Sequence, residues 1–478
     1  MKKLTILILC LLLSLPLLGC QEHAAPTTEV TTVESNPITE ATELVWTGYT
    51  GPKDEYIYYY TEGRDLQWEE DVLFFINSHM TDNMLLRNRS FLVNLPGVRT
   101  DSANFYNEAL YQNLLAAVNT LIPQISELTD NEILQHIQIM SAMFRDVHTR
   151  VCIYEEPIYP VFFHAFHEDG QFAFYTVILP LEHEELLYMR LAAINDIPLA
   201  EVIERMRSYD GHENEYGFIR DLGEGGYSQE LLSRPAALEA VGISAIGDTQ
   251  VKYTLADSEG NTHDLILAAK EEYDFSQCVG TTPARALPVP YSNAATANYW
   301  YSTDLAEDTL YVRIYSFVPM EEYTYMDFSN DLSLEQRAAG QFDKIILDLR
   351  DNGGGYDALG WRSIINTLSA MKFDNFYILV DGGTYSNSMI FSAEIAYQVP
   401  DVVFVGTPTG QAPGFFAGVY ENDYVMPNCG VEFTIPTTYW QTFEANEENT
   451  LMPDVVIWQT LDEYVSCKDV ALEYVLHP

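Results

Sequence analysis

Basic residues are scarce in this sequence, which has 24 Lys and Arg against 70 Asp and Glu and a net charge of −46. A surface so acidic repels phosphate backbones and anionic lipid headgroups. We therefore expect no nucleic-acid partner. The stretch between Lys372 and Lys468 contains no basic residue, which excludes a lysine base from that part of the chain.

Common metal and nucleotide motifs are also missing. The sequence has no HExxH, no Walker-type glycine loop and no GxGxxG after a strand pattern. Beyond the first twenty residues it has four cysteines, which are widely spaced and form no CxxC pair: Cys152, Cys278, Cys429 and Cys467. We expect no metal site and no cofactor. The cysteine spacing leaves one or two disulfides open.

A long apolar run occurs only at the N-terminus. A short basic start, "MKK", precedes "LTILILCLLLSLPLL" and then "LLGC", the pattern of a secretory signal. The end of this run resembles the lipobox of bacterial lipoproteins, which implies cleavage after residue 19 and acylation of Cys20. The alternative is an ordinary signal peptide with an unrelated cysteine. Residues 20–50, rich in Thr, Glu and Ala, predict a solvated tether. We expect an extracytoplasmic protein anchored to the bacterial membrane by lipid.

Hydrophobic periodicity divides the rest of the chain into three parts. Residues 51–150 contain apolar positions at i, i+3, i+4 and i+7, which predict a small helical domain. Residues 151–275 are rich in strand patterns, and "LAAINDIPLAEVIERM" followed by a hairpin pattern at 249–269 predicts a PDZ-like or other small α+β insert. Residues 276–478 alternate continuous apolar strands with helices, which predicts a sheet covered on both faces. The fold class is therefore α/β and multidomain.

The last part carries three segments in a specific order. "KIILDLRDNGGGYD" places glycines directly after a strand, "ILVDGGTYSNSMIFSAE" follows, and "VVFVGTPTGQAPG" precedes "MPDVVI". This order resembles the tail-specific, or C-terminal-processing, serine peptidases. The resemblance implies a ClpP/crotonase-like catalytic core, with Ser386 as the nucleophile. The alternative for Ser386 is a simple helix N-cap.

A glycine-rich turn allows backbone N–H groups to point at a developing negative charge. We expect the amides of Gly353 and Gly354, together with that of Asn387 at the start of the following helix, to form an oxyanion hole. The alternative is an ordinary turn between a strand and a helix.

The resemblance differs at the position of the general base. The best-known branch of the family has a lysine where this sequence has Gln411. The segment "DVHT" resembles the tricorn-core-like branch, which implies that His148 is the base. In that branch a glutamate before the "PD" motif orients the histidine, which implies Glu447 or Glu448 here. In so acidic a chain, the alternative for each of them is a solvated carboxylate.

These observations predict a membrane-tethered serine endopeptidase that acts on polypeptides through an acyl-enzyme. The alternative is a catalytically degenerate lipoprotein that binds peptides or other ligands on the same fold. The sequence does not identify the substrate or the oligomeric state.

Overall fold

A computed structural model describes most of the chain beyond residue 62. The described residues are 63–83, 85–86, 92–94, 106–153, 157–223, 230–270, 277–280, 297–355, 360–418 and 422–477. The expected signal peptide, Cys20 and the tether lie outside these ranges. Within the ranges, no helix is both long enough and apolar enough to cross a membrane.

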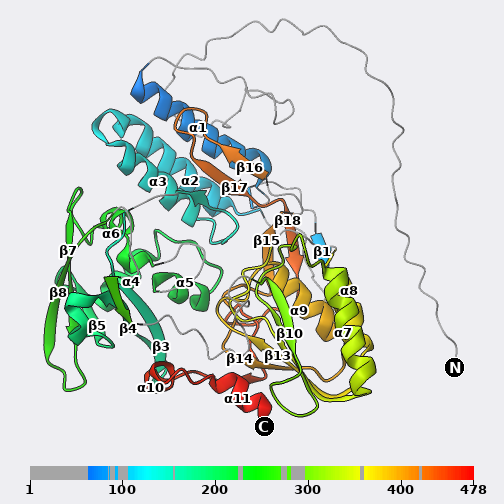
Figure 1. Cartoon of the computed structure of the whole chain (residues 1–478). Coiled ribbons are helices and arrows are strands. Elements are labelled where there is room, and N and C mark those ends of the chain that lie inside the picture. Colours follow the sequence, from blue (N-terminus) through cyan, green and yellow to red (C-terminus); the bar gives the residue numbers. More distant parts are fainter. Residues whose placement is uncertain are drawn as a thin grey trace, which may run out of the picture. The chain divides into compact units, whose positions relative to one another are not determined.

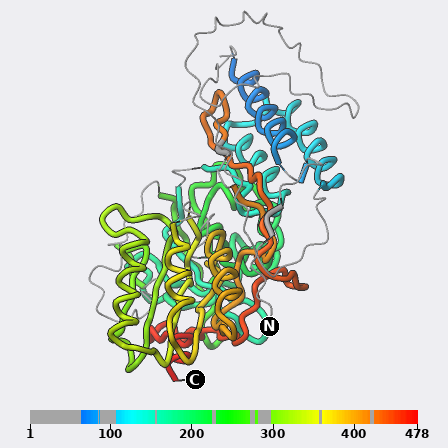
Figure 2. The backbone as a smooth tube through the Cα atoms, turned by 90° about the vertical axis from the view of Figure 1, so that its right-hand side faces the viewer, coloured from blue at the N-terminus to red at the C-terminus, as the bar shows by residue number. Residues whose placement is uncertain are grey.

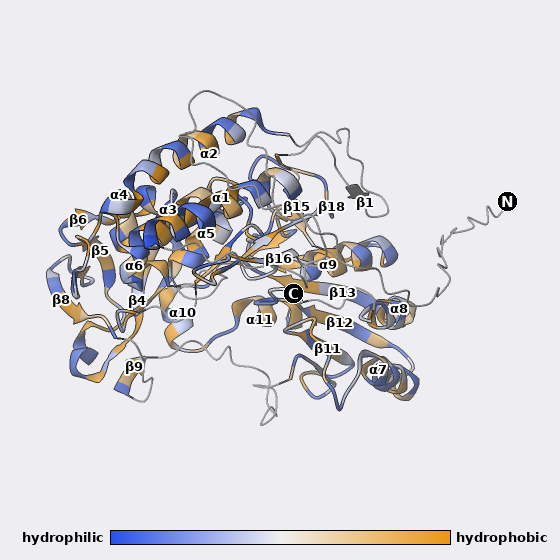
Figure 3. Cartoon of the chain, turned by 90° about the horizontal axis from the view of Figure 1, so that it is seen from above, coloured by the Kyte–Doolittle hydropathy of each residue, from blue (hydrophilic) through white to orange (hydrophobic). Residues whose placement is uncertain are grey.

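The part of the chain expected to be helical contains α1 (Arg64–Asp82), α2 (Glu108–Leu121) and α3 (Asp130–Ala142). Thr129 begins α3 with a capping box, because its side chain accepts from the Glu132 amide while Glu132 accepts from the Thr129 amide. Hydrophilic and hydrophobic residues alternate along α2 (Figure 3), as expected of a helix with one buried face.

The middle part forms a seven-stranded sheet with the path β3-β4-β5-β7-β8, with β6 paired to β5 and β9 paired to β4. The expected hairpin at 249–269 is present, because Gln250 pairs with Ala268 and Ala256 with Thr262. The strands are β3 (Phe162–Glu168), β4 (Gln171–Pro180), β5 (Arg190–Ile194), β6 (Ile197–Pro198), β7 (Gln250–Ala256), β8 (Thr262–Ala268) and β9 (Cys278–Gly280). The helices are α4 (Leu199–Met206), α5 (Glu215–Leu222) and α6 (Pro235–Ala240).

The core sheet has the strand order β10-β11-β12-β13-β14-β19. β10 and β11 are antiparallel, and every other neighbouring pair in this sheet is parallel, as continuous apolar strands predict. Helices α7 and α8 pack side by side near β11, β12 and β13 (Figures 1 and 3). The strands are β10 (Tyr299–Ser302), β11 (Thr309–Ile314), β12 (Phe342–Asp348), β13 (Phe373–Val380), β14 (Val403–Gly406) and β19 (Val455–Val456). The helices are α7 (Tyr325–Ala339), α8 (Arg362–Ala370), α9 (Asn387–Gln398), α10 (Leu461–Val465) and α11 (Val470–Leu476).

A C-terminal excursion connects the front of the chain to the core. β16 (Asn422–Val425) and β17 (Glu432–Ile435) form a hairpin, and β17 also pairs with β2 (Val151–Cys152), directly after the "DVHT" segment. The tube in Figure 2 shows this excursion running along α1, and the carboxylate of Asp71 in α1 accepts from the amides of Asn428 and Cys429. A second small sheet has the order β1-β18-β15, from β1 (Leu92–Asn94), β18 (Thr438–Gln441) and β15 (Gly414–Ala417).

The ends of the core strands are fixed by a buried ion cluster. Asp348, at the end of β12, lies 2.6 Å from both Arg313 and Arg350, and Arg350 also reaches Asp469 at 2.7 Å. Asp348 and Arg350 therefore hold the start of the glycine turn. The four cysteines are free thiols, so neither of the disulfides left open by the sequence forms.

Candidate active site

Ser386 lies at the junction of β13 and α9. It occupies the N-cap position of α9, but its side chain makes no capping hydrogen bond. Its backbone angles are φ 54° and ψ −119°, a conformation that costs a residue other than glycine about 1–3 kcal/mol. The simple N-cap alternative is therefore wrong, because this hydroxyl is held in a strained turn without serving the helix.

The two neighbouring serines differ from Ser386. The hydroxyl of Ser392 donates to the Ser388 carbonyl at 2.7 Å, which is the usual behaviour of a serine inside a helix. The hydroxyl of Ser388 is fully buried and has no hydrogen-bond partner among the described residues. Only Ser386 of the three is partly accessible to solvent.

The glycine turn after β12 lies directly against Ser386. A Cβ atom placed on Gly354 would lie 2.7 Å from the Ser386 Cβ and 3.2 Å from its Oγ. Gly354 also has φ +97°, which favours glycine. The turn is fixed to the loop before α9 by the Tyr385 amide, which donates to the Asn352 carbonyl at 2.9 Å.

The three backbone amides expected to form the oxyanion hole differ in their surroundings. The Gly354 amide donates to Asn352 Oδ1 at 2.8 Å, so its expected role is wrong for this geometry: Gly354 provides space rather than a donor. The Asn387 amide, in the first turn of α9, has no hydrogen bond within the described ranges. Gly353 is exposed on the same turn. The Asn387 side chain donates to the Gly355 carbonyl, which ties α9 to the glycine turn.

His148 lies in a tight turn made by its own segment. Asp146 is buried and accepts from the Thr149 hydroxyl at 2.6 Å and from the His148 amide at 3.3 Å. The Thr434 hydroxyl in β17 donates to the His148 carbonyl at 2.5 Å. The imidazole stacks on Phe415 of β15, with 5.8 Å between ring centroids. The C-terminal hairpin and β15 thus bring an N-terminal histidine to the core.

Glu213 is the carboxylate that sequence reasoning missed. One donor atom from each of Asp146, His148 and Glu213 lies within 4.8 Å of the others. Gln411 Nε2 donates to Glu213 Oε1 at 2.5 Å, and Gln411 Oε1 accepts from the Ser386 amide at 3.1 Å. No hydrogen bond joins Ser386 and His148 directly within the described residues. The two are connected through Gln411 and Glu213.

Glu447 and Glu448 are not part of this cluster. Both are exposed on the loop before β19. The next residue, Asn449, donates from its side chain to the Glu213 carbonyl at 3.0 Å, and its own carbonyl accepts from the Asn214 side chain at 2.9 Å. This loop was expected to carry the orienting glutamate. It instead supports the backbone of Glu213.

Burial controls the charges of this cluster. Burial, with a smaller contribution from the nearby Arg150, lowers the pKa of His148 to about 3. Burial raises the pKa of Asp146 to about 7. Burial, together with the charge of Asp146, raises the pKa of Glu213 to about 8. The imidazole is therefore neutral at pH 7, as a general base must be.

A second histidine anchors the segment that carries Glu213. His212 Nε2 lies 2.8 Å from Asp210 and 3.0 Å from Asp221, and all three are buried. Burial lowers the pKa of His212, but the two carboxylates outweigh it and raise the pKa well above its usual value. "DGHENE" (210–215) is the local signal that could have revealed this segment, because it places a histidine among carboxylates before a helix cap.

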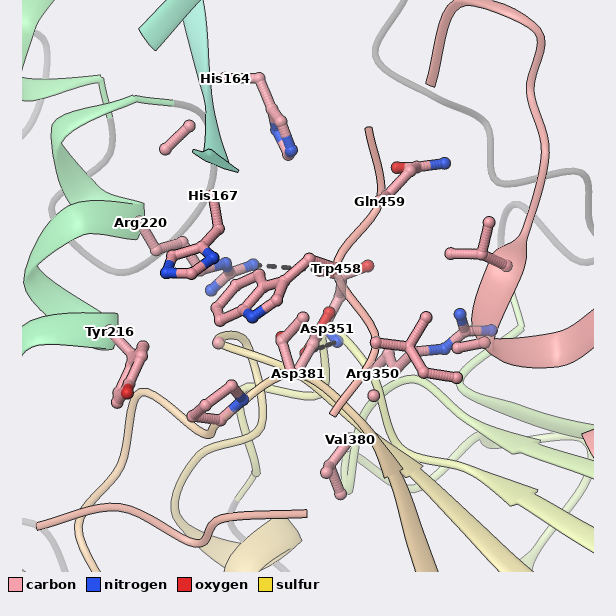
Figure 4. A pocket seen from close by; sticks show the side chains of 18 of the residues that line it. His164, His167, Tyr216, Arg220, Arg350, Asp351, Val380, Asp381, Trp458 and Gln459 are labelled. Carbon is pink, nitrogen blue, oxygen red and sulfur yellow. Dashed lines mark hydrogen bonds and ion pairs between the residues drawn. The ribbon is translucent and has the colours of Figure 1, made fainter. Parts of the chain in front are cut away.

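A cavity of about 370 Å³ lies at the carboxyl ends of β13 and β14. Figure 4 shows Trp458 at its centre with His167 stacked above it, and the two ring centroids are 4.6 Å apart. Arg220 of α5 pairs with Asp351 of the glycine turn at 3.2 Å in the wall. Neither Ser386 nor His148 lines this cavity.

Comparison by sequence finds no matching protein-family model and no matching curated protein. Comparison of structures finds mature CPAF complexed with lactacystin, with a TM-score of 0.54 at 12% identity, covering 86% of this chain and 97% of that one. Mature CPAF itself gives 0.53 at 12%, covering 86% and 96%. The chain has the CPAF fold. The photosystem II D1 C-terminal processing protease covers 82% of this chain and 93% of its own at 12% identity, but its TM-score of 0.36 is too low to carry weight. The CPAF fold extends over the helical, middle and core parts together and confirms the α/β multidomain class expected from the sequence.

Proposed function

We propose that this chain is a serine endopeptidase, tethered by lipid at Cys20 outside the bacterial membrane, that hydrolyses polypeptides through an acyl-enzyme. One observation carries the proposal: the Ser386 hydroxyl lies on a strained turn and does not cap its helix, while the Ser386 backbone amide donates to Gln411, which in turn donates to Glu213 of the Asp146–His148–Glu213 cluster. A strained, unused hydroxyl at a helix N-terminus is the arrangement of an activated nucleophile.

In the proposed reaction the Ser386 oxygen attacks the carbonyl carbon of the peptide bond. His148 accepts the serine proton and passes it to the leaving amine, and water then releases the acyl group. His148 Nδ1 lies 3.9 Å from Asp146 Oδ1, so the opposite nitrogen, Nε2, is the one assigned to Ser386. The developing oxyanion takes the Asn387 amide and the positive end of α9.

The orienting role passes from Glu447 and Glu448 to the carboxylates that lie beside the imidazole. Asp146 and Glu213 are held by Thr149 and Gln411, so each keeps a fixed position against the ring. A fixed carboxylate selects the histidine tautomer that accepts a proton from serine.

An edge strand supports a polypeptide substrate. Among the described strands, β15 pairs with β18 alone in its three-stranded sheet, and its Phe415 stacks on His148. An extended peptide added to the open edge of β15 passes beside the catalytic imidazole, with main-chain hydrogen bonds that do not depend on sequence.

A fluorophosphonate probe tests the proposal on the full-length chain. Labelling is expected in the wild type, to be lost in Ser386→Ala, and to fall by about 10²–10⁴-fold in His148→Ala. Glu213→Gln is expected to slow labelling, whereas Glu447→Gln and Glu448→Gln keep the wild-type rate. A folded wild-type chain that is never labelled would favour a binding lipoprotein. Labelling with cleavage of esters but not peptides would overturn the peptidase assignment.

A further inference from the structure

The Asp146–His148–Glu213 cluster has the chemistry of a metal site as well as that of a catalytic one. It combines one imidazole nitrogen with two carboxylates, donors that suit Zn²⁺. His148 Nδ1 lies 3.9 Å from Asp146 Oδ1. Zn–N and Zn–O bonds are about 2.1 Å long, so two atoms that share one ion lie at most about 4.2 Å apart. The separation between Nδ1 and Oδ1 is within this limit, and the donor atoms of all three residues lie within 4.8 Å of one another.

Two of the donor atoms that face one another are free to bind, and the third, Asp146 Oδ1, accepts only a long hydrogen bond from the His148 amide at 3.3 Å. His148 Nδ1 and Glu213 Oε2 are shielded from solvent, and neither has a hydrogen-bond partner among the described residues. The remaining oxygens are already held: the Thr149 hydroxyl donates to Asp146 Oδ2 at 2.6 Å, and Gln411 donates to Glu213 Oε1 at 2.5 Å. Hydrogen bonds to the second oxygen of a ligand carboxylate are the usual outer support of a metal site.

The neighbouring His212 cluster shows the contrast. His212 Nε2 is hydrogen-bonded to Asp221 Oδ2 at 3.0 Å and lies 2.8 Å from Asp210 Oδ2, so the ring nitrogen that faces the carboxylates is already in use. The Asp146–His148–Glu213 cluster lacks such a closed set of contacts.

We propose that the Asp146–His148–Glu213 cluster binds one Zn²⁺ ion and that the bound ion switches the peptidase off, an inference that rests on the proposed function for its regulatory part. A neutral imidazole carries one hydrogen and one lone pair. When Zn²⁺ takes the lone pair of Nδ1, the hydrogen of the neutral ring stays on Nε2. The nitrogen assigned to Ser386 then has no lone pair with which to accept the serine proton. The ion also occupies the two carboxylates that orient the ring.

Direct binding to the full-length chain tests the site itself, by calorimetry with Zn²⁺ and by the visible absorption of Co²⁺. We expect one ion per chain. Glu213→Gln and Asp146→Asn, which preserve side-chain shape, should weaken binding at least about tenfold, and Gln411→Ala, which removes an outer support, by about 10–100-fold. The control is His263→Ala, because His263 forms a surface pair with Asp257 at 3.4 Å outside the cluster; it should bind as the wild type does. Circular dichroism establishes that each variant is folded. Wild-type affinity in folded Glu213→Gln and Asp146→Asn would overturn the site.

Labelling of Ser386 by the fluorophosphonate tests the regulation. Saturating Zn²⁺ should slow labelling at least tenfold, and a chelator should restore it. Unchanged labelling with the site filled would overturn the regulatory role. A chain that binds Zn²⁺ with the expected variant pattern but is never labelled keeps the metal site and refutes the proposed peptidase. A chain that is labelled but binds no Zn²⁺ keeps the proposed peptidase and refutes the metal site.

Discussion

Replacing Gly354 by alanine tests the geometry of the glycine turn against Ser386. The new Cβ would lie 2.7 Å from the Ser386 Cβ and 3.0 Å from the Asn387 amide nitrogen. Contacts of that length do not occur, so the turn and the serine must move apart. The position also has φ +97°, which adds a backbone cost of about 1–3 kcal/mol for a residue with a side chain.

The expected loss of activity follows from the displacement of Ser386. A shift of about 1 Å in a reacting group costs on the order of 10²-fold in rate, so Gly354→Ala should be labelled by a fluorophosphonate about 10²-fold more slowly than the wild type. The free energy of unfolding should fall by about 1–3 kcal/mol from the backbone term, and by more where the overlap is not relieved.

A matched control separates strain from overlap. Gly340 ends α7 with φ +79°, and a Cβ placed there would meet nothing within 4 Å. Gly340→Ala should therefore lose a similar amount of stability in urea denaturation but keep the wild-type labelling rate. The reasoning would be refuted if Gly354→Ala, folded by circular dichroism, were labelled as fast as Gly340→Ala.

Three further predictions concern stability. Ser386→Gly should be more stable than Ser386→Ala by about 1 kcal/mol in urea denaturation, because glycine releases the strain at φ 54° but adds chain entropy; equal stability would show that the turn is unstrained. Asp348→Ala should cost about 3–5 kcal/mol, because it removes the carboxylate that the buried Arg313 and Arg350 share; a loss below 1 kcal/mol would contradict this. Burial lowers the pKa of His79 to about 3. Between pH 6.5 and pH 3, therefore, only the unfolded state binds a proton at this residue. The free energy of unfolding should fall as the pH falls, by about 2 kcal/mol from pH 6.5 to pH 5. His79→Gln should lose that part of the pH dependence in denaturation at the two pH values, and an unchanged dependence would assign it to other groups.

The elements of the fold were predictable because their signals are local. Apolar spacing over residues 51–150 predicted helices, and α1 and α3 lie there. Continuous apolar runs predicted the parallel strands β11 to β14. The glycine turn beside Ser386 was predictable as a pair of segments, because turns at the carboxyl ends of neighbouring parallel strands meet at one edge of the sheet.

The partner of His148 was not predictable, because tertiary contacts place it. Glu213 reaches the site through the cap of α5, where the Asn214 side chain donates to the Thr409 carbonyl at 3.1 Å. No spacing in the sequence connects residue 213 with residue 409. Glu447 was expected from its position before the "PD" motif, but that loop supplies backbone support through Asn449 and leaves Glu447 in solvent.

Gln411 explains why a histidine rather than an amine suits this site. Its side chain is fully buried and uses both ends of the amide, since Oε1 accepts from the Ser386 amide and Nε2 donates to Glu213. A lysine carries donors only, so it could approach Glu213 but could not accept from the backbone of Ser386. An amide at this position therefore holds the serine turn and the glutamate at the same time. The absence of basic residues between Lys372 and Lys468 is thus compatible with the proposed mechanism, in which the neutral imidazole of His148 is the base.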